Sequence, residues 1–234
     1  LGELQKSEKD RDQNGVSKDV QIAIAYARGD TLEGTTKIQG AIQVSPKRVA
    51  TWETLGTVYR DIKFATGALE WAVRSFQTAI ALEPTSPVLH TELGKLLVTN
   101  EENEKARKEF EKAVELKPDY VEAQRQIAFI LEKEKDVENA IVKMKGIALQ
   151  YPLDTESLFQ LGRLYYNNGQ IEEAITQFQQ VLQLVPTYSN ARFALGVALE
   201  KHGKIKEAIQ EFEKVLELNP GNEAVAKKLQ GLRK

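Results

Sequence analysis

The sequence predicts an all-α fold in which antiparallel helix pairs follow one another along the chain. The first observation is a period of 34 residues, marked by five prolines: Pro84, Pro118, Pro152, Pro186 and Pro220. The second is that small residues recur in step with these prolines. The third is an alanine that is followed four residues later by a large apolar side chain. A fixed period of this length indicates a repeat architecture, in which each unit buries its apolar face against its neighbours.

Each period is expected to hold two short helices. Helices of about a dozen residues are marginal alone in water, so each must bury an apolar stripe. The first helix carries an apolar residue followed by a small one: Leu93-Gly94, Ile127-Ala128, Leu161-Gly162 and Leu195-Gly196. The second carries Ala106, Ala140, Ala174 and Ala208, with Phe110, Met144, Phe178 and Phe212 four residues later. We expect the small residues of the two helices to face each other, and the larger side chain to fill the space between units.

The same period places the ends of the helices. Proline cannot continue a helix, so each proline is expected to close the second helix of its unit. The polar residues Ser86, Asp154 and Asn222 follow three of these prolines, and we expect them to cap the next helix.

These positions resemble the tetratricopeptide repeat (TPR) family, whose pattern is W-x2-L-G-x2-Y, then A-x3-F, then P. The best match is Trp52-x2-Leu55-Gly56-x2-Tyr59. The resemblance implies a right-handed superhelical solenoid of antiparallel helix pairs. Five repeats are expected, at 49–86, 87–120, 121–154, 155–188 and 189–222. The first has four extra residues between Asp61 and Leu69, in or beside its inter-helix turn.

The two ends of the chain depart from the repeat. Residues 1–16 are a polar N-terminal segment, and 17–48 read as a degenerate TPR-like helix pair. Residues 223–234 are expected to form a C-terminal capping helix with Val225 and Leu229 inward, because a stack needs a polar end to stay soluble.

The resemblance also implies a binding site, since the first helix of each TPR lines the concave groove. The positions that point into this groove combine aromatic and cationic residues: Lys95, Arg125, Phe129, Phe159, Arg163, Tyr166, Asn190 and Phe193. Aromatic residues and arginine supply most interface hot spots. We therefore expect a protein-protein interaction scaffold that binds a peptide or protein segment with apolar and acidic residues. The alternative is that these aromatic side chains only pack against the adjacent helix.

A weaker candidate site lies near the N-terminus. Asp10, Asp12 and Asn14, followed by Gly15, match the opening of a calcium-binding loop. The twelfth position is Gln21, where such a loop needs a bidentate glutamate, so a polar turn is favoured. His90 and His202 lack partners at metal-ligand spacing and are expected at the surface. No metal site is therefore predicted.

Composition excludes several classes of function. Lys+Arg number 32 against 34 Asp+Glu, so no strong positive field favours nucleic acid. There is no cysteine, and no run approaches the roughly 18 apolar residues that predict a membrane span, so direct membrane insertion is not expected. No nucleophile elbow or phosphate-binding glycine loop is present, so we expect neither an enzyme nor a cofactor.

A second, fainter resemblance concerns the stretch that begins VATWETLGTVYRDI. It is similar to the repeat tails of bacterial membrane proteins of the O-antigen polymerase or ligase type. This resemblance implies an alternative function, a spacer or assembly tail of a membrane-bound polysaccharide enzyme. The chain is then expected to be soluble, either in the cytoplasm or as an extracytoplasmic tail. Self-association through the ends of the stack stays open.

Overall fold

The structure is a computed structural model that describes residues 47–61 and 67–233, and every regular element in these ranges is an α-helix. The helices are α4 (Val49–Asp61), α5 (Ala68–Leu82), α6 (Pro87–Thr99), α7 (Asn103–Leu116), α8 (Val121–Lys133), α9 (Val137–Gln150), α10 (Thr155–Asn167), α11 (Ile171–Leu184), α12 (Ser189–Lys201), α13 (Ile205–Leu218) and α14 (Glu223–Leu232). The predicted all-α fold is confirmed. The calcium-loop residues Asp10, Asp12 and Asn14 and most of the helix pair expected at 17–48 lie outside the described residues.

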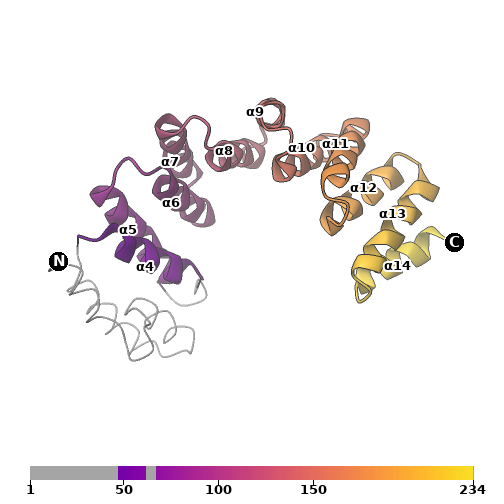
Figure 1. The fold of residues 1–234 in the computed structure, drawn as a ribbon, viewed down its shortest axis with the longest axis horizontal. Coiled ribbons are helices and arrows are strands. Elements are labelled where there is room, and N and C mark those ends of the chain that lie inside the picture. The colour runs from indigo at the N-terminus through magenta and orange to yellow at the C-terminus, as the bar shows by residue number, and fades with distance from the viewer. Residues whose placement is uncertain (1–46, 62–66, 234) are drawn as a thin grey trace. The chain divides into compact units, whose positions relative to one another are not determined.

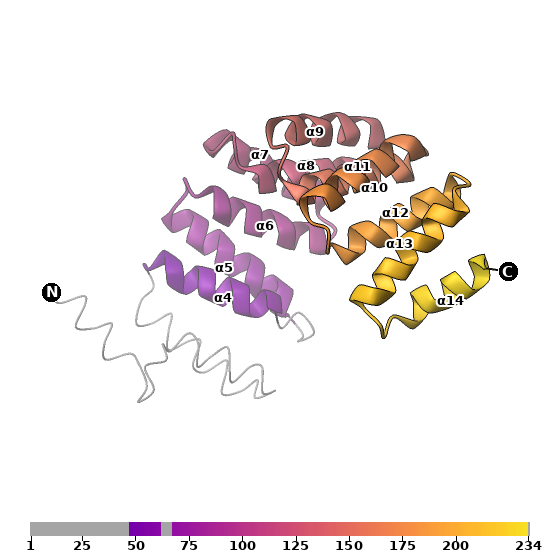
Figure 2. The ribbon, with the colours of Figure 1, turned by 45° about the vertical axis from the view of Figure 1, so that its right-hand side comes forward.

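The chain divides into two compact units, with the boundary between Ala123 and Gln124, inside α8. In the first unit α4 packs against α5, α5 against α6, and α6 against α7 (Figure 1). In the second unit each helix from α9 to α14 packs against the next (Figure 2). Each unit is therefore built from consecutive antiparallel helices, as the 34-residue period predicts.

In four of the five described helix pairs the core contains an aromatic ring set against a glycine, and the pair α8 and α9 has Met144 and Ala128 instead. Phe76, Phe110, Phe178 and Phe212 are at most 2% exposed. A Cβ atom at Gly56, Gly94, Gly162 or Gly196 would lie 2.4 to 2.8 Å from the ring of one of them. The room left by the absent Cβ is filled by the ring one turn along the second helix, because only a glycine lets the flat ring lie against the helix backbone.

Each second helix ends before a repeat proline, and one non-helical residue separates the two. α5, α7, α9, α11 and α13 each stop two residues before a repeat proline. The intervening residue has φ between −126° and −142° and ψ between 71° and 92°, so it lies outside the helical region, which proline disfavours for the residue before it.

The capping prediction holds for one residue of the three. The Asn222 side chain accepts the Val225 N–H at 3.2 Å. Ser86 makes no side-chain cap bond, and neither does Asp154, whose carboxylate instead accepts bonds from Arg125 and Ser157.

The turn inside each pair contains one residue in the left-handed region. These residues recur every 34 positions: Gly67, Glu101, Lys135, Gly169 and Gly203, with φ between 62° and 86°. Two of the five are not glycine, so two turns adopt a conformation that L-residues disfavour.

The helix bounds also place the four extra residues of the first repeat. Gly67 follows the end of α4 by six positions, whereas Glu101 follows the end of α6 by two. At the other end of the chain, Val225 and Leu229 of α14 are buried, at 1% and 3% exposure, as expected for a capping helix.

Candidate protein-binding surface

The residues proposed for binding in the second unit lie on its first helices, α8, α10 and α12. We call this set the first-helix surface: Arg125, Phe129, Phe159, Arg163, Tyr166, Asn190 and Phe193. Phe129 and Phe193 are each 40% exposed. Asn190 is exposed, and the other four residues are half-buried. Lys95, the eighth predicted residue, is a half-buried residue of α6 in the first unit.

The aromatic residues of this surface are both exposed and packed. The Phe159 ring lies 5.4 Å from Tyr188 and 5.8 Å from Phe178, between ring centroids. The Phe193 ring lies 5.6 Å from Phe212. Phe178 and Phe212 are the buried rings that face Gly162 and Gly196. Surface phenylalanines therefore rest on core phenylalanines, which fixes their orientation and leaves part of each ring uncovered.

The cations of the first-helix surface are engaged with carboxylates of the neighbouring helix. Arg163 of α10 donates two hydrogen bonds to Glu132 of α8, at 2.9 and 2.5 Å. Asn167 donates to the same carboxylate at 3.1 Å, and the Arg163 Nε donates to Gln160 at 2.9 Å. A bidentate guanidinium–carboxylate contact is both strong and directional, so it fixes α8 against α10.

Arg125 is held in the same way. Its Nη1 donates a hydrogen bond of 2.8 Å to Asp154, the residue just before α10. The Arg125 and Asp154 side chains are 20% and 26% exposed. Both predicted arginines therefore tie adjacent repeats together, and neither presents a free positive charge to a partner.

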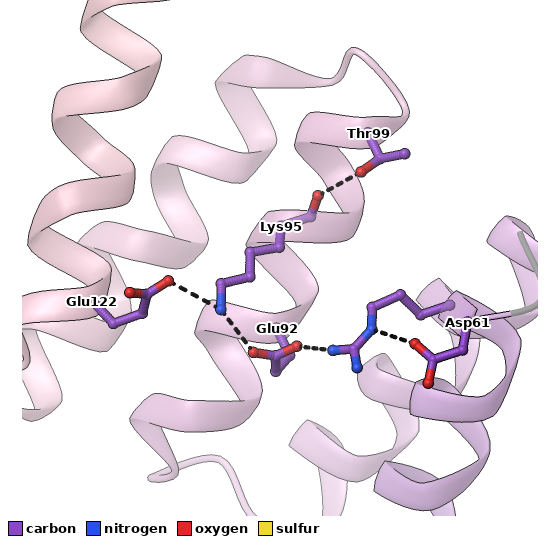
Figure 3. A network of polar contacts seen from close by, with 6 residues as sticks. Asp61, Glu92, Lys95, Thr99 and Glu122 are labelled. Atoms are coloured by element: carbon purple, nitrogen blue, oxygen red, sulfur yellow. Dashed lines mark hydrogen bonds and ion pairs between the residues drawn. The ribbon is translucent and has the colours of Figure 1, made fainter. Parts of the chain in front are cut away.

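The first unit contains a similar network, drawn in Figure 3. Lys95 lies between two carboxylates, 3.0 Å from Glu92 on its own helix and 3.1 Å from Glu122 of α8. Glu92 also accepts a bond from Arg60 of α4, at 2.5 Å. Burial by itself lowers the pKa of Lys95, but the hydrogen bonds and the charges of Glu92 and Glu122 outweigh it and raise that pKa.

Two residues that the sequence reasoning missed lie against the first-helix surface. Lys201, at the end of α12, places its Nζ 4.7 Å from the ring centroid of Tyr166. Tyr188, just before α12, covers Phe159 and donates its hydroxyl to Glu156 at 3.3 Å. Burial, followed by the Glu156 charge, raises the pKa of Tyr188. Tyr188 lies outside the first helices, so a pattern confined to helix positions could not have found it.

The histidine prediction is wrong for His90, which is buried at 7% exposure. Its Nδ1 lies 2.7 Å from a Glu109 oxygen, and its Nε2 lies 3.2 Å from the Pro84 carbonyl oxygen. Arg192 occupies the same repeat position and binds Glu211 and the Pro186 carbonyl in the same way. His90 therefore replaces an arginine in a tertiary contact that recurs. His202 is exposed, as expected.

Within residues 47–61 and 67–233, no three His, Cys, Asp or Glu side chains come together as a metal-binding group. No helix in the part of the chain that the structure describes is long and apolar enough to cross a membrane.

Comparisons with known proteins agree with the fold. Residues 89–120 and residues 159–223 match two sequence profiles, both described as tetratricopeptide repeat. No curated protein sequence matches the chain.

Many solved structures are similar. PilW, a type IV pilus biogenesis factor, has a TM-score of 0.71 at 20% identity, over 90% of this chain and 96% of PilW. YrrB, a TPR protein with an unusual peptide-binding site, has a TM-score of 0.57 at 21% identity, over 82% of this chain and 97% of YrrB. MamA from Desulfovibrio magneticus RS-1 has a TM-score of 0.58 at 24% identity, over 71% and 96%. At these identities the likeness shows the fold.

The second resemblance, to the tails of O-antigen polymerases or ligases, receives no support from these matches. The helix pairs, the glycine–aromatic contacts and the two profile matches agree with one another. The chain therefore carries tetratricopeptide repeats, at residues 89–120 and 159–223.

Proposed function

We propose that this chain is a protein-interaction scaffold without catalytic activity, and that it binds a peptide or protein segment across the first-helix surface. The observation that carries the proposal is the exposure of Phe129 and Phe193, each 40% open to solvent. Aromatic side chains gain much from burial, and the fold leaves part of each of these rings uncovered. A partner that covers these rings completes their burial.

The packing beneath the rings favours binding. Phe193 rests on Phe212, and Phe159 is held between Phe178 and Tyr188. A side chain that is already fixed loses little rotational entropy when a partner binds, so more of the contact energy appears as affinity. The Glu132–Arg163 contact holds the helices that present these rings.

The ion pairs change the expected chemistry of the partner. Arg125 and Arg163 are each bound to a carboxylate, so an acidic partner would have to displace Asp154 or Glu132. Breaking such a pair leaves a charge without its partner, which is costly in a half-buried site. We therefore propose a segment whose apolar side chains cover the phenylalanines, without a requirement for acidic residues.

The similar structures support the general proposal. One is described as a TPR protein with a peptide-binding site, and another as a pilus biogenesis factor. Those descriptions belong to YrrB and PilW, and they do not identify a partner for this chain.

Selection from a displayed library of random peptides tests the proposal. We expect enrichment of peptides with aromatic or aliphatic residues, and a loss of affinity of about tenfold or more in the Phe129→Ser/Phe193→Ser variant. Leu218→Ser is the matched control, because Leu218 is also 40% exposed but lies on α13, a second helix. The proposal fails if no peptides are enriched, or if the phenylalanine variant and the control bind them equally well.

A further inference from the structure

The outward face of α9 carries the most exposed large apolar side chains among the described residues. Val142 is 68% exposed and Leu149 is 75% exposed. Leu153, in the turn after α9, is 76% exposed. Phe129 and Phe193, the exposed rings of the first-helix surface, are each only 40% exposed. These three residues, together with Gly146, are called the α9 face below.

The repeat supplies an internal comparison for this face. The positions equivalent to Val142 in the flanking repeats are Lys108, Thr176 and Gln210. Those equivalent to Gly146 are Lys112, Gln180 and Lys214. Those equivalent to Leu149 are Glu115, Gln183 and Glu217, and those equivalent to Leu153 are Asp119, Thr187 and Gly221. The same fold thus places no large apolar residue at these positions in the second, fourth and fifth repeats, so packing inside the chain does not require one.

The spacing of the α9 face fits a second helix. Val142, Gly146 and Leu149 are separated by four and three residues, so they share one side of α9. Val142 and Leu149 are about 10 Å apart along the helix axis, at 1.5 Å per residue. Between them Gly146 is exposed, and a Cβ atom there would meet nothing within 4 Å. A glycine at the middle of an apolar stripe lets a second backbone approach closely.

Two of the charges beside the stripe are positive and unengaged, and Glu138 lies one turn before Val142 on the same side of α9. Within the described residues Lys143 and Lys145 of α9 form no ion pair with a carboxylate. Some outward cations of the other second helices are paired locally, for example Arg74 with Glu70 and Lys214 with Glu211, whereas the exposed Lys108 and Lys206 show no such pair in the described part of the chain. The α9 face therefore combines apolar side chains with two cations that are available to a partner.

We propose that the α9 face docks an amphipathic helix whose apolar stripe is flanked by acidic residues. The apolar side chains of such a helix cover Val142 and Leu149, and its carboxylates pair with Lys143 and Lys145. This is the helix-packing mode of recognition, with anchors at helical spacing. The site is separate from the first-helix surface, and acidic residues are proposed as a requirement only for the occupant of the α9 face.

Two other occupants fit the face less well. In a symmetric contact between two copies, the two-fold axis would pass midway between Val142 and Leu149, beside Lys145. The two Lys145 side chains would then face each other and repel. A membrane would need a broader apolar surface, because the remaining apolar residues of α9, such as Ile141 and Met144, are buried in the fold.

The experiment uses the chain's own repeats as a guide. In the graft variant, Val142→Thr, Leu149→Gln and Leu153→Thr give α9 the residues that α11 and its turn have at Thr176, Gln183 and Thr187. All three sites are exposed, so the helix content and unfolding midpoint should be unchanged. A displayed library of amphipathic helices with randomised flanking positions is selected against the wild-type chain. Binding of phosphatidylglycerol vesicles and the sedimentation mass are measured in parallel.

We expect enrichment of helices with Asp or Glu beside the apolar stripe. Their affinity should fall about tenfold or more in the graft variant and several-fold in Lys143→Glu/Lys145→Glu, and should be unchanged in Phe129→Ser/Phe193→Ser. The last control separates this site from the proposed function. The inference is overturned if no helix is enriched, if the enriched flanks are basic or uncharged, or if the graft binds equally well. It is also overturned if the α9 face instead mediates vesicle binding or dimerisation that the graft abolishes.

Discussion

Replacing Gly162 by alanine tests whether the glycine–aromatic contact determines how the two helices of a repeat pack. A Cβ atom at this position would lie 2.7 and 2.9 Å from two carbon atoms of the Phe178 ring. Carbon atoms in proteins pack at about 3.5–4.0 Å, so the ring must move by nearly an ångström. Phe178 is only 2% exposed and its ring contacts Phe159, so there is little room for that movement.

The expected cost follows from two opposing effects. Overpacking of a core costs about 1–3 kcal/mol, and alanine is better than glycine inside a helix by about 1 kcal/mol. Gly162→Ala should therefore lower the free energy of unfolding by about 1 kcal/mol. Gly146→Ala is the matched control, because a Cβ atom there meets nothing within 4 Å. That variant should be more stable than the wild type by up to about 1 kcal/mol.

The third repeat supplies a compensating change. It has Ala128 and Met144 at the positions of Gly162 and Phe178. We therefore expect Phe178→Met to relieve the clash in the double variant Gly162→Ala/Phe178→Met. In urea unfolding followed by circular dichroism, the double variant should lose less stability than the two single variants together, by about 1–2 kcal/mol. Additive effects, or a stable Gly162→Ala variant, would refute the proposed packing.

Three further predictions concern turns and ion pairs. Lys135→Gly should raise the unfolding free energy by about 0.5–1 kcal/mol, since Lys135 has φ of 66° and glycine adopts this region without the cost borne by an L-residue; an unchanged or lower urea midpoint would contradict this. Arg163→Met should cost about 1–2 kcal/mol in the same assay, because Glu132 loses its two charged hydrogen bonds; the variant should match the wild type only if the pair is irrelevant to stability. The raised pKa of Lys95 means that its ion pairs contribute fully below the ordinary lysine value of 10.5 and are lost as the pH rises through the raised pKa. The stability difference between wild type and Lys95→Met should thus be largest near neutral pH and shrink as the pH rises above the ordinary lysine value of 10.5, and a constant difference would argue against the network.

The positions of the repeats were predictable from the sequence, but the side chains that each residue contacts were harder to predict. The 34-residue period located the prolines and the small and aromatic positions. It did not show that the ring fills the space beside each glycine, because the ring and the alanine lie on the same stripe of the second helix. It also did not reveal the left-handed turn residues Glu101 and Lys135, whose side chains give no conformational signal.

Whether the cations on the first helices are paired depends on contacts between repeats. Arg60 and Glu92 are 32 positions apart, and Glu132 and Arg163 are 31 apart. Opposite charges at slightly less than one period are therefore a signal that the sequence contains, although spacing alone does not show that the side chains meet. The burial of His90 has a similar signal, since Arg192 stands at the same repeat position.

Hydrogen–deuterium exchange with a peptide selected from the random library tests the proposed binding surface most directly. Peptide binding should slow exchange in α8, α10 and α12, where Phe129, Phe159 and Phe193 lie, and should leave α11 and α13 unchanged. Protection confined to the second helices, or the same protection in Phe129→Ser/Phe193→Ser, would contradict the proposal that these rings bind the partner.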